Sequence, residues 1–145
     1  MFQIDKPLPA ITEDGASYWA ATREHRLAVQ QCTACGHRRF PPSAVCPQCL
    51  GEEHTWAPLS GRGIVYSFII VHRPQHPAFA ADAPYNVAII ELDEGIRLHS
   101  NVVDIANDEL RVGLPVEVTF EKIDDEVTLP KFRPRRDALR PDDRR

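Results

Sequence analysis

With 145 residues, 43% of them apolar and 26% charged, the chain can bury one modest core and has the composition of an ordinary globular protein. Its net charge of −4 is uneven: residues 131–145 carry seven basic and three acidic side chains, which leaves ten basic against 18 acidic side chains in residues 1–130. Such an acidic body argues against a nucleic-acid-binding surface, because a phosphate backbone attracts basic groups. The first residues, MFQIDKPLPA, lack a signal-peptide pattern, and no apolar run approaches the roughly 18 residues of a membrane helix. We therefore expect a cytoplasmic protein without membrane segments.

The N-terminal third predicts an extended arm, a helix and a strand. Residues 1–11 contain prolines and no helical pattern. Good helix formers follow up to about His25, with Thr12 or Asp14 as the expected cap and Tyr18 and Trp19 on the expected packing face. Residues 27–32, LAVQQC, then predict a short strand that leads into the first cysteine.

The chain after Gly51 predicts a small barrel. Five segments are rich in β-branched or alternating apolar residues, and most are joined by short turns. They are residues 62–73, 85–92, 96–103, 115–123 and 126–132. Five strands with one long interruption favour the five-stranded Greek-key barrel known as the OB-fold. The expected fold is thus mainly β with an N-terminal helix, divided into an arm and helix (1–30), a cysteine-rich segment (31–54), a barrel (55–134) and a basic tail (135–145).

Two Cys-x-x-Cys pairs, Cys32/Cys35 and Cys46/Cys49, stand ten residues apart in the stretch CTACGHRRFPPSAVCPQC. In a cytoplasm thiols stay reduced, so clustered cysteines favour a metal over disulfides. Four thiolates satisfy tetrahedral zinc and leave no open position for water or substrate, which predicts one structural Zn²⁺. A rubredoxin-type iron site and a redox dithiol are the alternatives. His37, beside the second cysteine, is not needed as a ligand.

This layout resembles the DUF35 family, small proteins with a rubredoxin-like zinc ribbon and an acyl-CoA-associated OB-fold. Residues 18–50, 56–79, 84–104 and 112–134 carry the resemblance, and the most specific part places GRGIVYSFIIVHR after the cysteines. The resemblance implies a non-catalytic accessory subunit of an acyl-CoA enzyme. The implied partners are thiolase-superfamily enzymes (thiolases, hydroxymethylglutaryl-CoA synthases and lipid-transfer-protein-like aldolases) or MaoC-like hydratases, whose acyl-CoA channel the subunit would help to shape.

The long connection at residues 71–85, VHRPQHPAFAADAPY, is the predicted ligand-binding loop. OB-folds bind ligands through one face and its adjoining loops, and long ordered loops are often functional. Acyl-CoA needs cations for its phosphates and apolar contacts for its remainder. Arg73, His76, Phe79 and Tyr85 are therefore the candidate ligand-binding residues. The alternative is that the rings plug the barrel end while Arg73 and His76 are solvated.

Two other functions were weighed. For autonomous catalysis, the sequence offers no nucleophile elbow, no phosphate loop and no open metal site. Asp82 could form an acid–base pair with His76 or Tyr85, but no spacing rule supports this pairing. We therefore expect no catalytic residues. Binding of single-stranded nucleic acid would use Tyr66, Phe68 and Tyr85 as a stacking platform. The acidic charge of residues 1–130 argues against this function. Arg62, Lys131 and Arg133 are candidate phosphate contacts, with a solvated face as the simpler interpretation.

Overall fold

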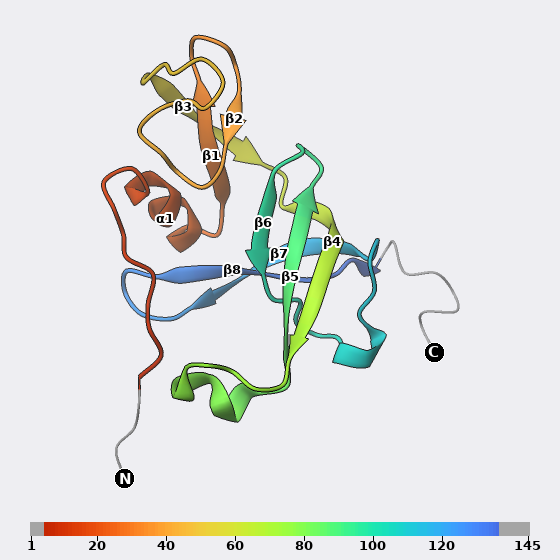
Figure 1. The fold of residues 1–145 in the computed structure, drawn as a ribbon. Helices are drawn as coiled ribbons and strands as arrows, with labels where there is room; N and C mark the ends of the chain where they lie inside the picture. Colours follow the sequence, from red (N-terminus) through yellow and green to blue (C-terminus); the bar gives the residue numbers. More distant parts are fainter. Residues whose placement is uncertain (1–4, 137–145) are drawn as a thin grey trace.

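The structure is a computed structural model that describes residues 5–136, and it consists mainly of β-strands with one short helix near the N-terminus (Figure 1). In chain order the elements are α1 (Ala16–Arg23), β1 (Leu27–Cys32), β2 (Arg38–Arg39), β3 (His54–Leu59), β4 (Arg62–Val71), the 3-10 helix η1 (Pro77–Asp82), β5 (Tyr85–Leu92), β6 (Arg97–Ser100), the 3-10 helix η2 (Asn107–Glu109), β7 (Pro115–Lys122) and β8 (Thr128–Pro134). The expected helix, the strand before the cysteines and the five barrel strands are all confirmed.

A three-stranded sheet in the order β2-β1-β3 forms the upper part of the molecule in Figure 1. β1 pairs antiparallel with β3 along its whole length, from Leu27 opposite Leu59 to Cys32 opposite His54. The loop that joins β2 to β3 carries Cys46 and Cys49. Because Cys32 ends β1, this pairing brings both Cys-x-x-Cys segments to the same end of the sheet.

The helix α1 lies between this sheet and the barrel. Its N-cap is Gly15, which makes no side-chain cap, so neither Thr12 nor Asp14 is the cap; the Thr12 hydroxyl instead accepts a hydrogen bond from the N–H of Gly15 at 3.2 Å. The helix ends two residues before the predicted His25. There the chain turns with His25 in the left-handed region (φ 60°), the N–H of Arg26 donates to the carbonyl of Ala21, and that of His25 donates to Thr22. This is the Schellman arrangement that satisfies the last carbonyls of a helix.

The five-stranded sheet has the order β6-β5-β4-β7-β8, with every neighbouring pair antiparallel. β4 pairs with β5 over its full length but with β7 only through residues Arg62–Ile64. A β-bulge between Val65 and Ser67 adds local twist, so the sheet curls around its buried face. The largest buried side chains of this barrel are Val65, Ile90, Leu92, Leu114, Val116 and Phe132.

The chain that follows β6 meets β8 at one parallel bridge, between Val102 and Phe132, and the sheet is therefore a half-barrel of the OB-fold type. Beyond the end of β6, a buried side chain, Asn86 on β5, takes the place of the backbone hydrogen bonds of the sheet. Its Oδ1 accepts from the N–H of Val102 at 2.7 Å, and its Nδ2 donates to the carbonyl of Val102 at 2.9 Å. The segment after Ser100 is thus held by an amide side chain and not by the backbone of a neighbouring strand.

Over residues 5–136, no helix has both the length and the apolar character that a membrane span requires. The predicted basic tail lies almost entirely outside the described residues, which end at Arg136.

Candidate functional site

Two matching turns build the cysteine cluster. In the first, the N–H of Cys32 donates to the carbonyl of His37 and the N–H of Gly36 donates to the carbonyl of Cys32, each at 2.9 Å. In the second turn Cys46, Leu50 and Gly51 repeat this pattern, again with both distances at 2.9 Å. Each turn therefore holds its Cys-x-x-Cys pair in a closed backbone ring.

A left-handed residue completes each turn. In the first turn it is Gly36 (φ 78°), as its place after Cys35 suggested. In the second turn it is Leu50 (φ 64°), not the glycine that follows it, and the Leu50 side chain is 75% exposed. A non-glycine residue rarely adopts this conformation, so the second turn carries local strain.

The four sulfur atoms are positioned to bind one zinc ion. All four lie within 4.8 Å of one another, with Sγ–Sγ distances of 3.5 Å between Cys32 and Cys49 and 3.6 Å between Cys35 and Cys46. A tetrahedral zinc site with Zn–S bonds of about 2.3 Å separates its sulfurs by roughly 3.8 Å. The backbone N–H of Cys35 also lowers the pKa of the Cys32 thiol to about 6, because it stabilises the thiolate that a metal needs. The predicted zinc ligands are confirmed as a group of four.

With four sulfur ligands the zinc site is closed and structural. Cys32 and Cys46 are buried, and a zinc ion held by the four sulfurs would connect their strand and turn across the site. His37 is not among the four grouped ligands. A zinc ion at this site would therefore stabilise the β1–β3 sheet.

The loop between β4 and β5 is ordered around η1. The ring nitrogen Nδ1 of His76 accepts from the N–H of Ala78 at 3.1 Å and so caps η1. The ring of Phe79 lies 5.9 Å from that of His76 and 6.3 Å from that of Tyr85. Three of the four candidate ligand-binding residues are therefore brought together in one aromatic group.

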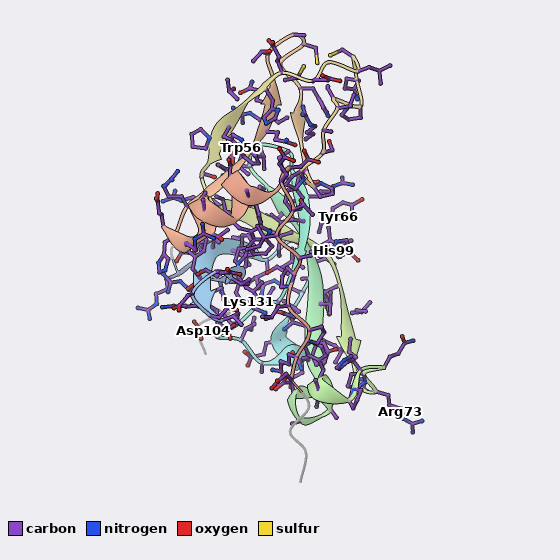
Figure 2. All side chains as sticks on the ribbon, turned by 90° about the vertical axis from the view of Figure 1, so that its left-hand side faces the viewer. Trp56, Tyr66, Arg73, His99, Asp104 and Lys131 are labelled. Carbon is purple, nitrogen blue, oxygen red and sulfur yellow. The ribbon has the colours of Figure 1, made fainter. Side chains whose placement is uncertain are left out.

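Arg73, the fourth candidate, lies apart from this group. It is the second residue after β4, its side chain is exposed, and Figure 2 shows it pointing away from the body of the molecule. The cation nearest to the rings is Lys6 of the N-terminal arm, whose Nζ lies 5.6 Å from the centre of the Phe79 ring. Lys6 also forms an ion pair with Asp82, so within residues 5–136 this carboxylate is paired with the arm and not with His76 or Tyr85.

A cavity of about 450 Å³ opens beside the aromatic group. Five segments surround it: the arm, the β4–β5 loop with the start of β5, the chain that follows β6, the end of β7 with the residue after it, and β8. Phe79 and Tyr85 contribute rings, while Lys131 contributes a half-buried ammonium group that donates to Oδ1 of Asn101. Figure 2 shows Lys131 on the side of the molecule along which the arm runs. Arg73 and His76 do not line this cavity.

Sequence reasoning treated Lys131 as a solvated residue and did not single out Lys6 or Asn101. Lys131 alternates with the buried Phe132 on β8, a pattern that indicates a solvent-facing side chain. Its environment depends on Asn101, 30 residues away in the sequence, and on the arm. No local pattern reports such a contact. Of the other two phosphate candidates, Arg133 pairs with Glu117 at 3.1 Å and Arg62 is exposed.

The aromatic residues weighed for other roles divide between core and surface. Tyr18 is 6% exposed and its ring lies 5.4 Å from that of Phe40, so the helix packs on the cysteine-rich unit. Phe68 packs against the hydrophobic core, whereas Tyr66 is exposed under the guanidinium of Arg97. Tyr66, Phe68 and Tyr85 therefore do not form a single exposed stacking platform.

Family models and known proteins match this architecture. The ChsH2 rubredoxin-like zinc ribbon domain matches residues 19–55, and the ChsH2 C-terminal OB-fold domain matches residues 56–121. A DUF35 domain-containing scaffold protein of Methanothermobacter thermautotrophicus is 32% identical over 117 residues, which are 80% of this chain and 87% of that protein.

Two further matches are 44% identical to this chain. One is a probable enoyl-CoA hydratase alpha subunit of Thermomonospora curvata, where 129 residues align, 89% of this chain but only 40% of the relative's length. The other is a solved structure described as an Ltp2-ChsH2(DUF35) aldolase, with a TM-score of 0.79 over 88% of this chain and 98% of the matched chain. The ribbon with its four cysteines, the half-barrel and these alignments lead to one conclusion: the chain belongs to the DUF35 family, with the zinc ribbon and OB-fold of the ChsH2 type.

Proposed function

We propose that this chain is a non-catalytic subunit of an acyl-CoA enzyme of the thiolase superfamily or the MaoC-like hydratases. It binds the catalytic subunit and contributes residues 71–85 to the wall of the shared acyl-CoA channel. The observation that carries the proposal is the ordered β4–β5 loop, with Phe79 and Tyr85 at a cavity and Arg73 exposed at its start.

The names of the relatives support the class of partner. The hydratase alpha subunit and the Ltp2-ChsH2(DUF35) aldolase, both 44% identical to this chain, have names that refer to acyl-CoA chemistry or to an aldolase assembly. This chain spans 40% of the hydratase subunit, so the activity of that whole protein is not transferred to it. What is transferred is the role of a subunit that accompanies such an enzyme.

The division of labour follows from the chemistry of the residues. The four cysteines are committed to zinc, so the catalytic subunit supplies the nucleophile and the general acid and base. Arg73 makes no hydrogen bond or ion pair within residues 5–136 and offers a planar guanidinium to a phosphate of CoA. The rings of Phe79 and Tyr85 offer apolar surface to the rest of the CoA arm. Holding that arm in one orientation contributes to rate without any chemical step on this chain.

The decisive experiment isolates the complex and compares it with its catalytic subunit alone. The tagged chain is recovered from native lysate, the partner is identified by mass spectrometry, and acyl-CoA turnover is measured with and without this chain. The complex should show a lower KM for acyl-CoA or a more stable catalytic subunit. Equal turnover, KM and stability of the catalytic subunit alone would contradict the proposal.

Matched variants test the loop itself. Arg73→Ala and Phe79→Ala should each raise the KM for acyl-CoA several-fold while zinc content and partner binding stay unchanged. Arg26→Ala removes an exposed arginine at the end of α1, far along the chain from the loop, and Val112→Ala removes an exposed apolar side chain outside it. Both controls should leave KM at the wild-type value.

A further inference from the structure

We propose that the cavity between the N-terminal arm and the half-barrel binds a monocarboxylate with an apolar chain, and that Lys131 donates hydrogen bonds to its carboxylate. The site belongs to this chain alone and requires no partner subunit. It therefore goes beyond the proposed function, and it is tested on the isolated protein.

Lys131 forms no ion pair within residues 5–136, and the carboxylates of Glu121 and Asp82 act on it only at longer range. It is half-buried on β8, and its only hydrogen bond in the part of the chain that the structure describes goes to Oδ1 of Asn101. An ammonium group has three N–H donors, so two of them have no protein acceptor there. Burial lowers the pKa of Lys131, because the charged amine has lost part of its hydration. A ligand oxygen at this position would supply the missing acceptor and the missing charge.

The side-chain amides around Lys131 already form hydrogen bonds within the protein. Nδ2 of Asn101 donates to the carbonyl of Asn86, and Nδ2 of Asn107 donates to that of Pro84 at 3.1 Å. Oδ1 of Asn107 accepts from Nδ2 of Asn86 at 3.2 Å. These bonds fix the side-chain amides and leave Lys131 as a donor at the cavity with unused hydrogens.

Much of the remaining lining is apolar. The rings of Phe79 and Tyr85 stand on one side, and aliphatic side chains from three other segments complete the lining: Ile105, Ile123 and Leu129. A volume of about 450 Å³ is within the range of ligand-binding cavities and accommodates a chain of several carbon atoms. A largely apolar lining beside the Lys131 ammonium fits a ligand with one charged end and an apolar body.

The charges at the cavity limit how much negative charge it accepts. Lys6 is neutralised by Asp82, which leaves Lys131 as the unpaired cation and Glu121 as an exposed carboxylate on the lining. A single carboxylate matches one cation. A phosphate or diphosphate would add charge against Asp82 and Glu121 and is therefore disfavoured.

The test is a calorimetric titration of the zinc-loaded full chain with hexanoate and with its neutral isostere hexanamide at neutral pH. Hexanoate should bind saturably with one site per chain, and hexanamide should bind about tenfold more weakly, since a charge-assisted hydrogen bond is lost. Lys131→Met should reduce hexanoate binding to the level of hexanamide. Lys131→Arg should retain most of it, because the positive charge remains.

A second variant makes the test specific to this cavity. Glu121→Gln removes the exposed carboxylate on the lining and should tighten hexanoate binding about two- to threefold without changing hexanamide binding. Absence of saturable hexanoate binding, equal affinity for the acid and the amide, or an unchanged affinity in Lys131→Met would each overturn the assignment. Because no partner enzyme is present, these results do not depend on the acyl-CoA role of the loop.

Discussion

The ammonium of Lys6 lies 2.5 Å from Oδ2 of Asp82, and this ion pair fastens the N-terminal arm to η1. The same ammonium lies over the ring of Phe79, and its pKa is raised chiefly by the hydrogen bond to Asp82. The arm otherwise has no regular secondary structure before α1. One pair of side chains therefore joins the arm to the loop that carries the aromatic group.

Removing this pair should loosen the arm with little effect on overall stability. Both side chains are about half exposed, and exposed ion pairs contribute at most about 1 kcal/mol to the free energy of unfolding. In Asp82→Asn we expect faster amide hydrogen exchange in residues 5–11, measured by mass spectrometry, with a nearly unchanged Tm. Asp93→Asn, in the β5–β6 turn, is the matched control and should leave exchange in the arm as it is. Unchanged exchange in Asp82→Asn would mean that other contacts hold the arm.

Replacing a zinc ligand should remove the metal and unfold the ribbon. The Cys46→Ala variant retains only three thiolates at a site that is closed by four, and metal-binding free energy at such a site is folding free energy. Zinc content, measured by elemental analysis, should fall from about one ion per chain to near zero, together with a marked drop in Tm. Gln48→Ala, exposed in the same turn, should keep its zinc. Lowering the pH should also release zinc from the wild-type protein, because protons compete for the thiolates. A Cys46→Ala protein that retained full zinc and wild-type Tm would exclude the structural role.

Leu50→Gly should stabilise the protein. The residue is left-handed (φ 64°) and 75% exposed, so glycine relieves backbone strain and little burial is lost. We expect the free energy of unfolding of the zinc-loaded protein to rise by about 0.5–1 kcal/mol, seen as a higher Tm. Val45→Gly is the control, since Val45 is exposed but is not among the left-handed residues, and that change should lower the Tm. A lower Tm in Leu50→Gly would show that the leucine side chain stabilises the second cysteine turn.

The buried hydroxyl of Tyr18 should make the stability of the protein fall as the pH becomes alkaline. Burial raises the pKa of its hydroxyl to about 12, whereas an unfolded chain has the ordinary value of about 10. As the pH rises from 10 towards 12, the unfolded chain loses this proton first, so the free energy of unfolding falls by up to about 1.4 kcal/mol per pH unit. Chemical denaturation at a series of pH values should show a shallower alkaline loss in Tyr18→Phe than in the wild type. Tyr66→Phe, with an exposed ring, should behave as the wild type does; identical slopes in all three proteins would contradict the assignment.

The cysteine spacing and the strand patterns by themselves determined the ribbon and the barrel. Cys-x-x-Cys turns are local, and both turns close with the same backbone hydrogen bonds between residues at most five apart. The alternation around Leu98 and around Val116 likewise reports one buried face of a strand, because neighbouring side chains point to opposite sides. Short-range chemistry of this kind is visible in the sequence.

Tertiary structure alone decided the cavity and the residues that form it. Asn86 bridges to Val102, 16 residues away, Lys131 donates to Asn101, 30 residues away, and Lys6 pairs with Asp82 across the helix, the ribbon and β4. These polar contacts depend on where the curled sheet brings distant backbone segments together, and no periodicity in the chain records that distance. Arg73 illustrates the reverse case: it is adjacent to the aromatic residues in the sequence, yet the direction of the chain at the end of β4 carries it away from the cavity that Phe79 and Tyr85 line.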